Sequence, residues 1–87
     1  MIYGYPEKVV DEEHGLLQLR EVTLAMTSEQ LRLVARFLAH VATELESGAP
    51  FSHRHIAEVV PEWESIHPGV DIIGSPPIEA EFPEIAF

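Results

Sequence analysis

Residues 27–50 read TSEQLRLVARFLAHVATELESGAP, and this stretch decides the fold. Thr27 can cap a backbone N–H of a first helical turn, and Gln30, three residues later, can reach back to Thr27 in a capping box. Apolar residues then recur at steps of three and four as far as Leu45. Gly48 and Pro50 supply a stop. The pattern predicts a helix over residues 28–47.

A projection at 100° per residue gives this helix two apolar rows. The main row is expected to face the core and consists of Leu31, Ala35, Leu38 and Leu45. A second row with Leu33 and Phe37 lies to one side and continues through His40 and Glu44. Either a loop or the C-terminal residues cover Phe37, or this flank contacts another protein or a second copy.

The candidate partner-binding residues are Leu33, Phe37, His40 and Trp63. Trp63 is the single tryptophan, and a lone tryptophan serves either as a core or lid residue or as a contact hot spot. Both interpretations stay open at this point.

The residues before the helix predict a β-hairpin. Residues 2–10 suit a strand, which Pro6 limits to an edge position or a bulge. A polar run ending in Gly15 follows, and alternation from Leu17 onward indicates a long second strand.

The residues after the helix are less regular. The alternation of Phe51, His53, His55 and Ala57 suits a strand, whereas Ser52 could cap a short helix; a strand is predicted for the first half of residues 51–60. Beyond Trp63, the sequence predicts a turn over 67–69 and a short strand over 70–73.

Together these elements predict a small two-layer α+β fold in the order strand, strand, helix, strand, strand. One long helix is expected to pack on one face of a mostly antiparallel sheet. Residues 1–75 would form a single domain, and residues 76–87 an acidic, proline-containing tail. Ile78, Ala80 and Phe82 alternate with glutamates, and this pattern predicts that the tail is docked on an apolar surface.

Composition narrows the classes of function. The chain of 87 residues has no cysteine, which excludes disulfides, thiolate metal sites and cysteine nucleophiles. Fifteen acidic against five basic residues give a net charge of -10, which disfavours nucleic acid and anionic membranes. The acidity serves either solubility or the attraction of a basic partner. No stretch has the pattern of a signal peptide or a membrane span, so a cytoplasmic protein is expected.

His53 and His55 are the one pair with the spacing of metal ligands on a strand. On a helix the two imidazoles would diverge, and no third ligand is singled out by the sequence. The serines occupy predicted caps and turns, and no phosphate-binding glycine loop is present. We therefore expect no catalytic residues, no metal and no cofactor; a metal, if bound, would use His53 and His55.

The chain resembles small bacterial immunity proteins encoded beside polymorphic toxins, of the family catalogued as immunity protein thirty-two. The resemblance covers about residues 21–74 and rests on the residue pattern of the helix start, Arg36-Phe37-Leu38, His53-x-His55-Ile56, Pro61-x-Trp63 and Val70-Asp71-Ile72-Ile73. It implies a compact α+β fold that binds and blocks a toxin domain. The tail after Gly74 has no counterpart in this pattern.

The sequence therefore favours a non-catalytic protein-binding module, of which an immunity-type inhibitor is one form. The first alternative is a homo-oligomeric accessory or structural protein, for example a homodimer. The second is a metal-dependent enzyme that uses His53 and His55.

Overall fold

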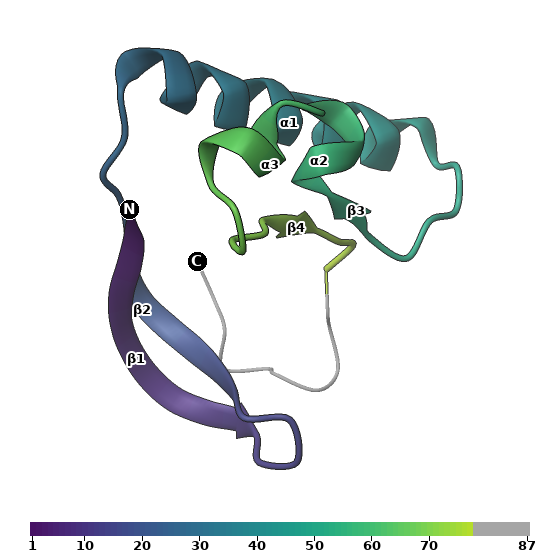
Figure 1. The fold of residues 1–87 in the computed structure, drawn as a ribbon. Coiled ribbons are helices and arrows are strands. Elements are labelled where there is room, and N and C mark those ends of the chain that lie inside the picture. The colour runs from purple at the N-terminus through teal and green to yellow at the C-terminus, as the bar shows by residue number, and fades with distance from the viewer. Residues whose placement is uncertain (78–87) are drawn as a thin grey trace. The chain divides into compact units, whose positions relative to one another are not determined.

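The computed structural model describes residues 1–77 of the chain, which adopt a small α+β fold (Figure 1). The chain divides into two compact units, Met1–Leu31 and Arg32–Phe87. The predicted docking of the tail concerns residues 78–87, which lie outside the described residues, and it stays a prediction.

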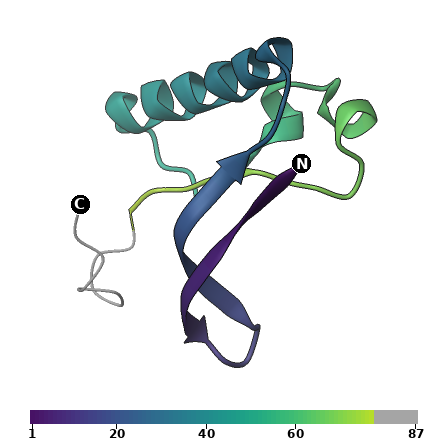
Figure 2. The same cartoon turned by 90° about the vertical axis from the view of Figure 1, so that its left-hand side faces the viewer.

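The first unit is dominated by a two-stranded antiparallel ribbon, as the sequence predicts. Strand β1 (Ile2–Asp11) pairs with strand β2 (Leu16–Leu24), and the ribbon is strongly twisted in Figure 2. Gly15 closes the turn with a φ of 68°, a left-handed conformation that glycine adopts without steric cost. The register shifts on both sides of Pro6, so the predicted bulge is confirmed.

Helix α1 (Ser28–Ser47) has the predicted bounds. The Gln30 N–H donates to Thr27 Oγ1 at 3.1 Å, and the Thr27 N–H donates to Gln30 Oε1 at 3.1 Å, which confirms the capping box. At the other end, Gly48 takes a φ of 74°, and its N–H donates to the Leu45 carbonyl at 3.2 Å. Local chemistry thus fixes both ends of the helix.

The second unit packs several short elements against the rest of α1 (Figure 1). These are strand β3 (Arg54–His55), helix α2 (Ile56–Val59), helix α3 (Trp63–Ile66) and strand β4 (Ile73–Gly74). Its core consists of the buried side chains Val34, Phe37, Val41, Ile56, Val60 and Trp63. A Cβ atom at Gly74 would lie 3.0 Å from both methyl carbons of Val41, so α1 contacts β4 directly.

The predicted single sheet is wrong in its arrangement. β1 pairs only with β2, and β3 pairs only with β4, so the described residues form two separate two-stranded sheets. The strand predicted over residues 70–73 is reduced to Ile73–Gly74. In the segment left open, a two-residue strand is followed by one helical turn, so each alternative holds for part of it. Strands this short leave only a weak trace in a sequence.

The predicted core row of α1 is also wrong. Phe37 is fully buried, with 0% of its surface exposed, whereas Leu38 is 52% exposed. Val34, Phe37 and Val41 form the buried face, which lies about 90° around the helix from the predicted row. A phenylalanine buries more apolar area than a leucine, so burial of the face that contains Phe37 is the more favourable choice.

Candidate protein-binding surface

The ribbon exposes an unusual amount of apolar surface. Seven large apolar side chains of β1 and β2 keep between 49% and 56% of their surface exposed: Tyr3, Tyr5, Val9, Leu16, Leu17, Leu19 and Val22. A two-stranded ribbon has no second layer of its own to cover these side chains. The ribbon is therefore the first place to look for a binding surface.

The register distributes these side chains over both sides of the ribbon. Tyr3 and Tyr5 share one face of β1, but the register shifts on both sides of Pro6 break the alternation, so Val9 lies on the other face. Leu17 lies opposite Val9 in the register, and Leu19 is two residues further along β2. We call the exposed apolar surface of the ribbon, formed by Tyr3, Tyr5, Val9, Leu17 and Leu19 over both of its sides, the ribbon face.

The ribbon face has an acidic surround. Glu21 lies directly opposite Tyr5 in the register and is exposed, and Glu7 is an exposed neighbour on β1. Arg20 places its guanidinium 5.1 Å from the centre of the Tyr5 ring. The combination of apolar and aromatic area with carboxylates suits a partner that has an apolar patch and basic groups beside it.

Two of the four candidate partner-binding residues predicted from the sequence are core residues. Phe37 and Trp63 expose 0% and 1% of their surface, so neither can reach a partner while the core is closed. The Trp63 indole N–H donates to the Val70 carbonyl at 2.9 Å, which satisfies its polar atom internally. Leu33 is half-buried and His40 is exposed, and their role in binding stays a prediction.

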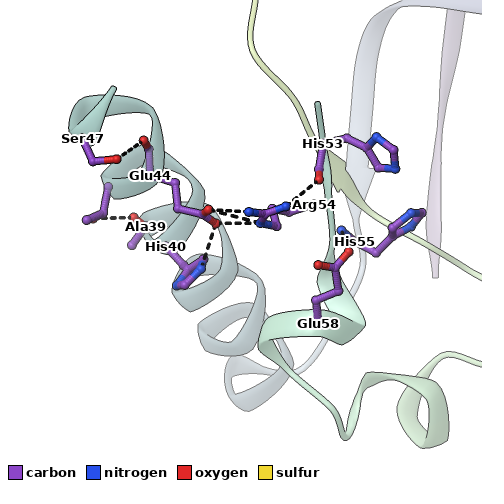
Figure 3. A network of polar contacts seen from close by, with 9 residues as sticks. Ala39, His40, Glu44, Ser47, His53, Arg54, His55 and Glu58 are labelled. Atoms are coloured by element: carbon purple, nitrogen blue, oxygen red, sulfur yellow. Dashed lines mark hydrogen bonds and ion pairs between the residues drawn. The ribbon is translucent and has the colours of Figure 1, made fainter. Parts of the chain in front are cut away.

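His40 belongs to a charged network that joins α1 to β3 (Figure 3). Its Nε2 lies 3.0 Å from Glu44 Oε1. Glu44 also accepts hydrogen bonds from Arg54 Nε at 3.0 Å and Nη2 at 2.9 Å. The Arg54 hydrogen bonds lower the pKa of Glu44, and Glu44 raises the pKa of Arg54. The charges of Glu44 and Arg54 compensate one another, so the network links α1 to β3 and does not offer an unpaired charge to a partner.

An open hollow of about 720 Å³ lies over this network, lined by His40, Glu44, Arg54, Glu58 and Val59. Glu58 accepts a hydrogen bond from the His55 backbone N–H at 3.0 Å and is thereby engaged as well. The charged groups that line the hollow therefore already have hydrogen-bond or ion-pair partners.

His53 and His55 lie on the same side of the β3 segment, as their spacing predicts (Figure 3). Their ring centres are 4.9 Å apart in an edge-to-face arrangement. His53 Nδ1 lies 3.1 Å from Ser52 Oγ, and His55 Nδ1 lies 2.5 Å from Asp71 Oδ2. Each ring thus has a separate polar partner, and within residues 1–77 no third ligand joins the two histidines.

One group of three potential metal ligands does occur at the ribbon turn, formed by Asp11, Glu13 and His14. Asp11 Oδ1 accepts hydrogen bonds from the backbone N–H groups of Glu13 and His14, and Asp11 Oδ2 lies 2.7 Å from His14 Nδ1. The His14 side chain holds the pKa of Asp11 below its ordinary value. Turn formation accounts for this grouping.

Sequence reasoning missed the ribbon face as a candidate site. The alternation of Tyr3 with Tyr5 and of Leu17 with Leu19 was the available signal. In the predicted single sheet, further elements would have helped to cover these side chains. The division into two sheets is what leaves the ribbon without sheet neighbours.

Comparison of the chain with family models, with curated proteins and with solved structures finds no match. Within residues 1–77, none of the helices has the length and apolar character needed to cross a membrane. The site must therefore be interpreted from its own chemistry.

Proposed function

We propose that the chain is a non-catalytic protein-binding module that docks a partner protein on the ribbon face. The observation that supports this most strongly is the set of half-exposed apolar side chains on that face, with two tyrosines among them. Tyrosine offers a large apolar contact area together with a hydroxyl that tolerates water, which suits a surface that is exposed until a partner binds.

The chemistry of the partner follows from the charges. The chain carries a net charge of -10, and exposed carboxylates such as Glu7 and Glu21 accompany the ribbon face. An apolar patch edged by lysine or arginine would be complementary, and the acidic field would speed its approach. Phosphate backbones and anionic lipid would be repelled, so we propose a protein partner in the cytoplasm and exclude nucleic acid and membranes from the proposal.

The resemblance to bacterial immunity proteins supplies a more specific form of this proposal, in which the partner is a toxin domain and binding inhibits it. A toxin-like reading frame beside the gene would favour this form. The metal-dependent enzyme receives no support from His53 and His55, because Nδ1 of each ring engages a separate partner and no third ligand joins the pair within residues 1–77.

The test is a binding experiment with a matched control. Partners are captured on the full-length chain, identified, purified and titrated against the wild type and two variants. Tyr3→Ser/Tyr5→Ser removes the aromatic area of the ribbon face, and Ile73→Ser removes a comparably exposed apolar side chain of β4. We expect the double variant to weaken binding at least about tenfold and the control to bind like the wild type.

Circular dichroism and thermal unfolding of both variants separate loss of binding from loss of fold. Equal affinity of the wild type and a folded double variant would contradict the proposal, as would the failure to find any protein that binds the purified chain. A Glu7→Gln/Glu21→Gln variant should lower the association rate more than it raises the dissociation rate, since these charges act on the approach.

A further inference from the structure

Helix α1 carries a second apolar surface that the core does not use. It consists of Leu31, Ala35, Leu38, Ala42 and Leu45, which we call the α1 stripe. Its three leucines are 40%, 52% and 40% exposed, in chain order, and both alanines are exposed. The stripe contains the row that the sequence predicts to face the core. Because Phe37 lies in the core instead, this row is exposed.

The spacing of the α1 stripe is that of a helix-pairing seam. Its members follow one another at steps of four, three, four and three residues, an average of 3.5. This period keeps one face of a helix in register with a partner helix, with leucines as knobs and alanines allowing close approach. Over residues 31–45 the stripe is about 21 Å long.

After Glu29 in the first turn, the charges of α1 change sign along the helix. Arg32 and Arg36 lie in the N-terminal half, and Glu44 and Glu46 lie in the C-terminal half. Arg36 pairs with Glu62, and Glu44 with Arg54. By contrast, no ion pair within residues 1–77 involves Arg32 or Glu46. These two each follow a leucine of the stripe and are two heptads apart, so they flank the same side of it.

We infer that the α1 stripe is the interface of a homodimer, in which it packs against the same stripe of a second copy with the two helices antiparallel. In that orientation Arg32 of each chain faces Glu46 of the other, and symmetry forms the pair twice. Ala39, midway between them, lies near the symmetry axis, where its small side chain permits close contact. A parallel pair would instead place Arg32 level with Arg32 and Glu46 level with Glu46, on opposite sides of the seam, so that neither gains an opposite charge.

A second copy suits the stripe better than the basic partner proposed for the ribbon face. Lysines or arginines of such a partner would meet Arg32 along the N-terminal half. An antiparallel copy of α1 instead presents Glu46 to Arg32 and Arg32 to Glu46, so the two helices are complementary in charge only in this orientation. The seam is short, so we expect a dimer that dissociates on the order of micromolar concentration. This inference concerns a different surface from the proposed function and stands or falls separately.

The test is the molar mass of the full-length chain by sedimentation over a wide concentration range. We expect the mass to rise to that of two chains for the wild type. Leu38→Lys, which places a charge in the middle of the stripe at a half-exposed position, should stay monomeric. Thr43→Lys adds the same side chain at an exposed position of α1 outside the stripe and should dimerise like the wild type.

Orientation is tested by charge reversal and by crosslinking. Arg32→Glu should weaken dimerisation at least about tenfold, and the double variant Arg32→Glu/Glu46→Arg should restore it. Because the chain has no cysteine, single cysteines report contacts without interference. A mixture of Arg32→Cys and Glu46→Cys chains should form crosslinked heterodimers, while each alone should crosslink poorly.

Three outcomes would overturn the inference. The wild type could stay monomeric throughout, which would include the case in which its own C-terminal residues cover the stripe. It could dimerise equally well as a folded Leu38→Lys variant, which would place the interface elsewhere. Finally, Arg32→Cys chains could crosslink with one another more readily than with Glu46→Cys chains, which would indicate parallel helices.

Discussion

The two compact units bury their apolar side chains in opposite ways. Within residues 1–77, all six buried apolar residues belong to the second unit, and none lies in Met1–Leu31. The first unit is held by backbone pairing between two strands that follow one another in the sequence and by a tight turn. The second collects its core from α1, α2 and α3. The comparison teaches that regular local structure and a buried core arise in different parts of this chain, and that the strands with the most regular pattern keep their apolar side chains exposed.

The largest expected effect follows from emptying the core of the second unit. Phe37→Ala should lower the free energy of unfolding by about 3–5 kcal/mol, because a fully buried aromatic side chain is replaced by a cavity. Tyr3→Ala in the ribbon should cost about 1 kcal/mol or less, since that side chain is half exposed. Urea denaturation followed by Trp63 fluorescence measures both. Equal losses would mean that the ribbon contributes to the core as much as the second unit does.

A middle-sized effect is expected where the two units share one helix. Thr27→Ala removes the side chain that accepts the Gln30 N–H and should lower the free energy of unfolding by about 1 kcal/mol. Thr27→Ser keeps the hydroxyl and is the control. The midpoint of thermal unfolding distinguishes them. A Thr27→Ala variant as stable as the Thr27→Ser variant would show that the capping box does not stabilise the helix.

The smallest effect concerns pH and the network between Glu44 and Arg54. Because Arg54 lowers the pKa of Glu44 in the folded chain, the unfolded chain binds its proton at higher pH. The stability that Glu44 contributes is therefore present above the ordinary glutamate pKa and is lost as pH falls through the lowered one. The difference in unfolding midpoint between the wild type and Glu44→Gln should shrink on acidification through this window. A difference that stays constant would assign the effect to something other than ionisation.

The sequence predicted what depends on neighbours along the chain. Thr27 with Gln30, Gly48, Gly15 and Pro6 each specify local geometry, and the structure has all four features where they were expected. It did not predict which face of α1 is buried, because the helix carries two apolar rows and only the distant residues Ile56, Val60 and Trp63 decide between them. Nor could it show that the strands form two sheets. β3 and β4 lie far apart in the sequence, and only two residues of each strand take part in their pairing.

The candidate surfaces were hidden for the same reason. Phe37 and Trp63 were chosen because large aromatic residues are frequent in interfaces, yet the same size makes them favourable in a core. The ribbon face and the α1 stripe could be identified only once it was known which apolar residues the core had taken. The histidine pair was placed correctly on one side of its strand, but the separate partners of the two rings depend on Asp71, sixteen residues beyond His55.

Pro6 has a further consequence for a chain that displays so much apolar strand. An exposed ribbon with free edges is a template on which further strands can add, and this is how fibrils grow. Proline cannot donate a backbone hydrogen bond, and the register shifts on both sides of it interrupt the regular row of donors and acceptors on β1. Growth by strand addition is thereby discouraged at mid-ribbon, while the side chains of the ribbon remain available. The irregularity at Pro6 therefore helps to protect the ribbon from adding strands of other copies.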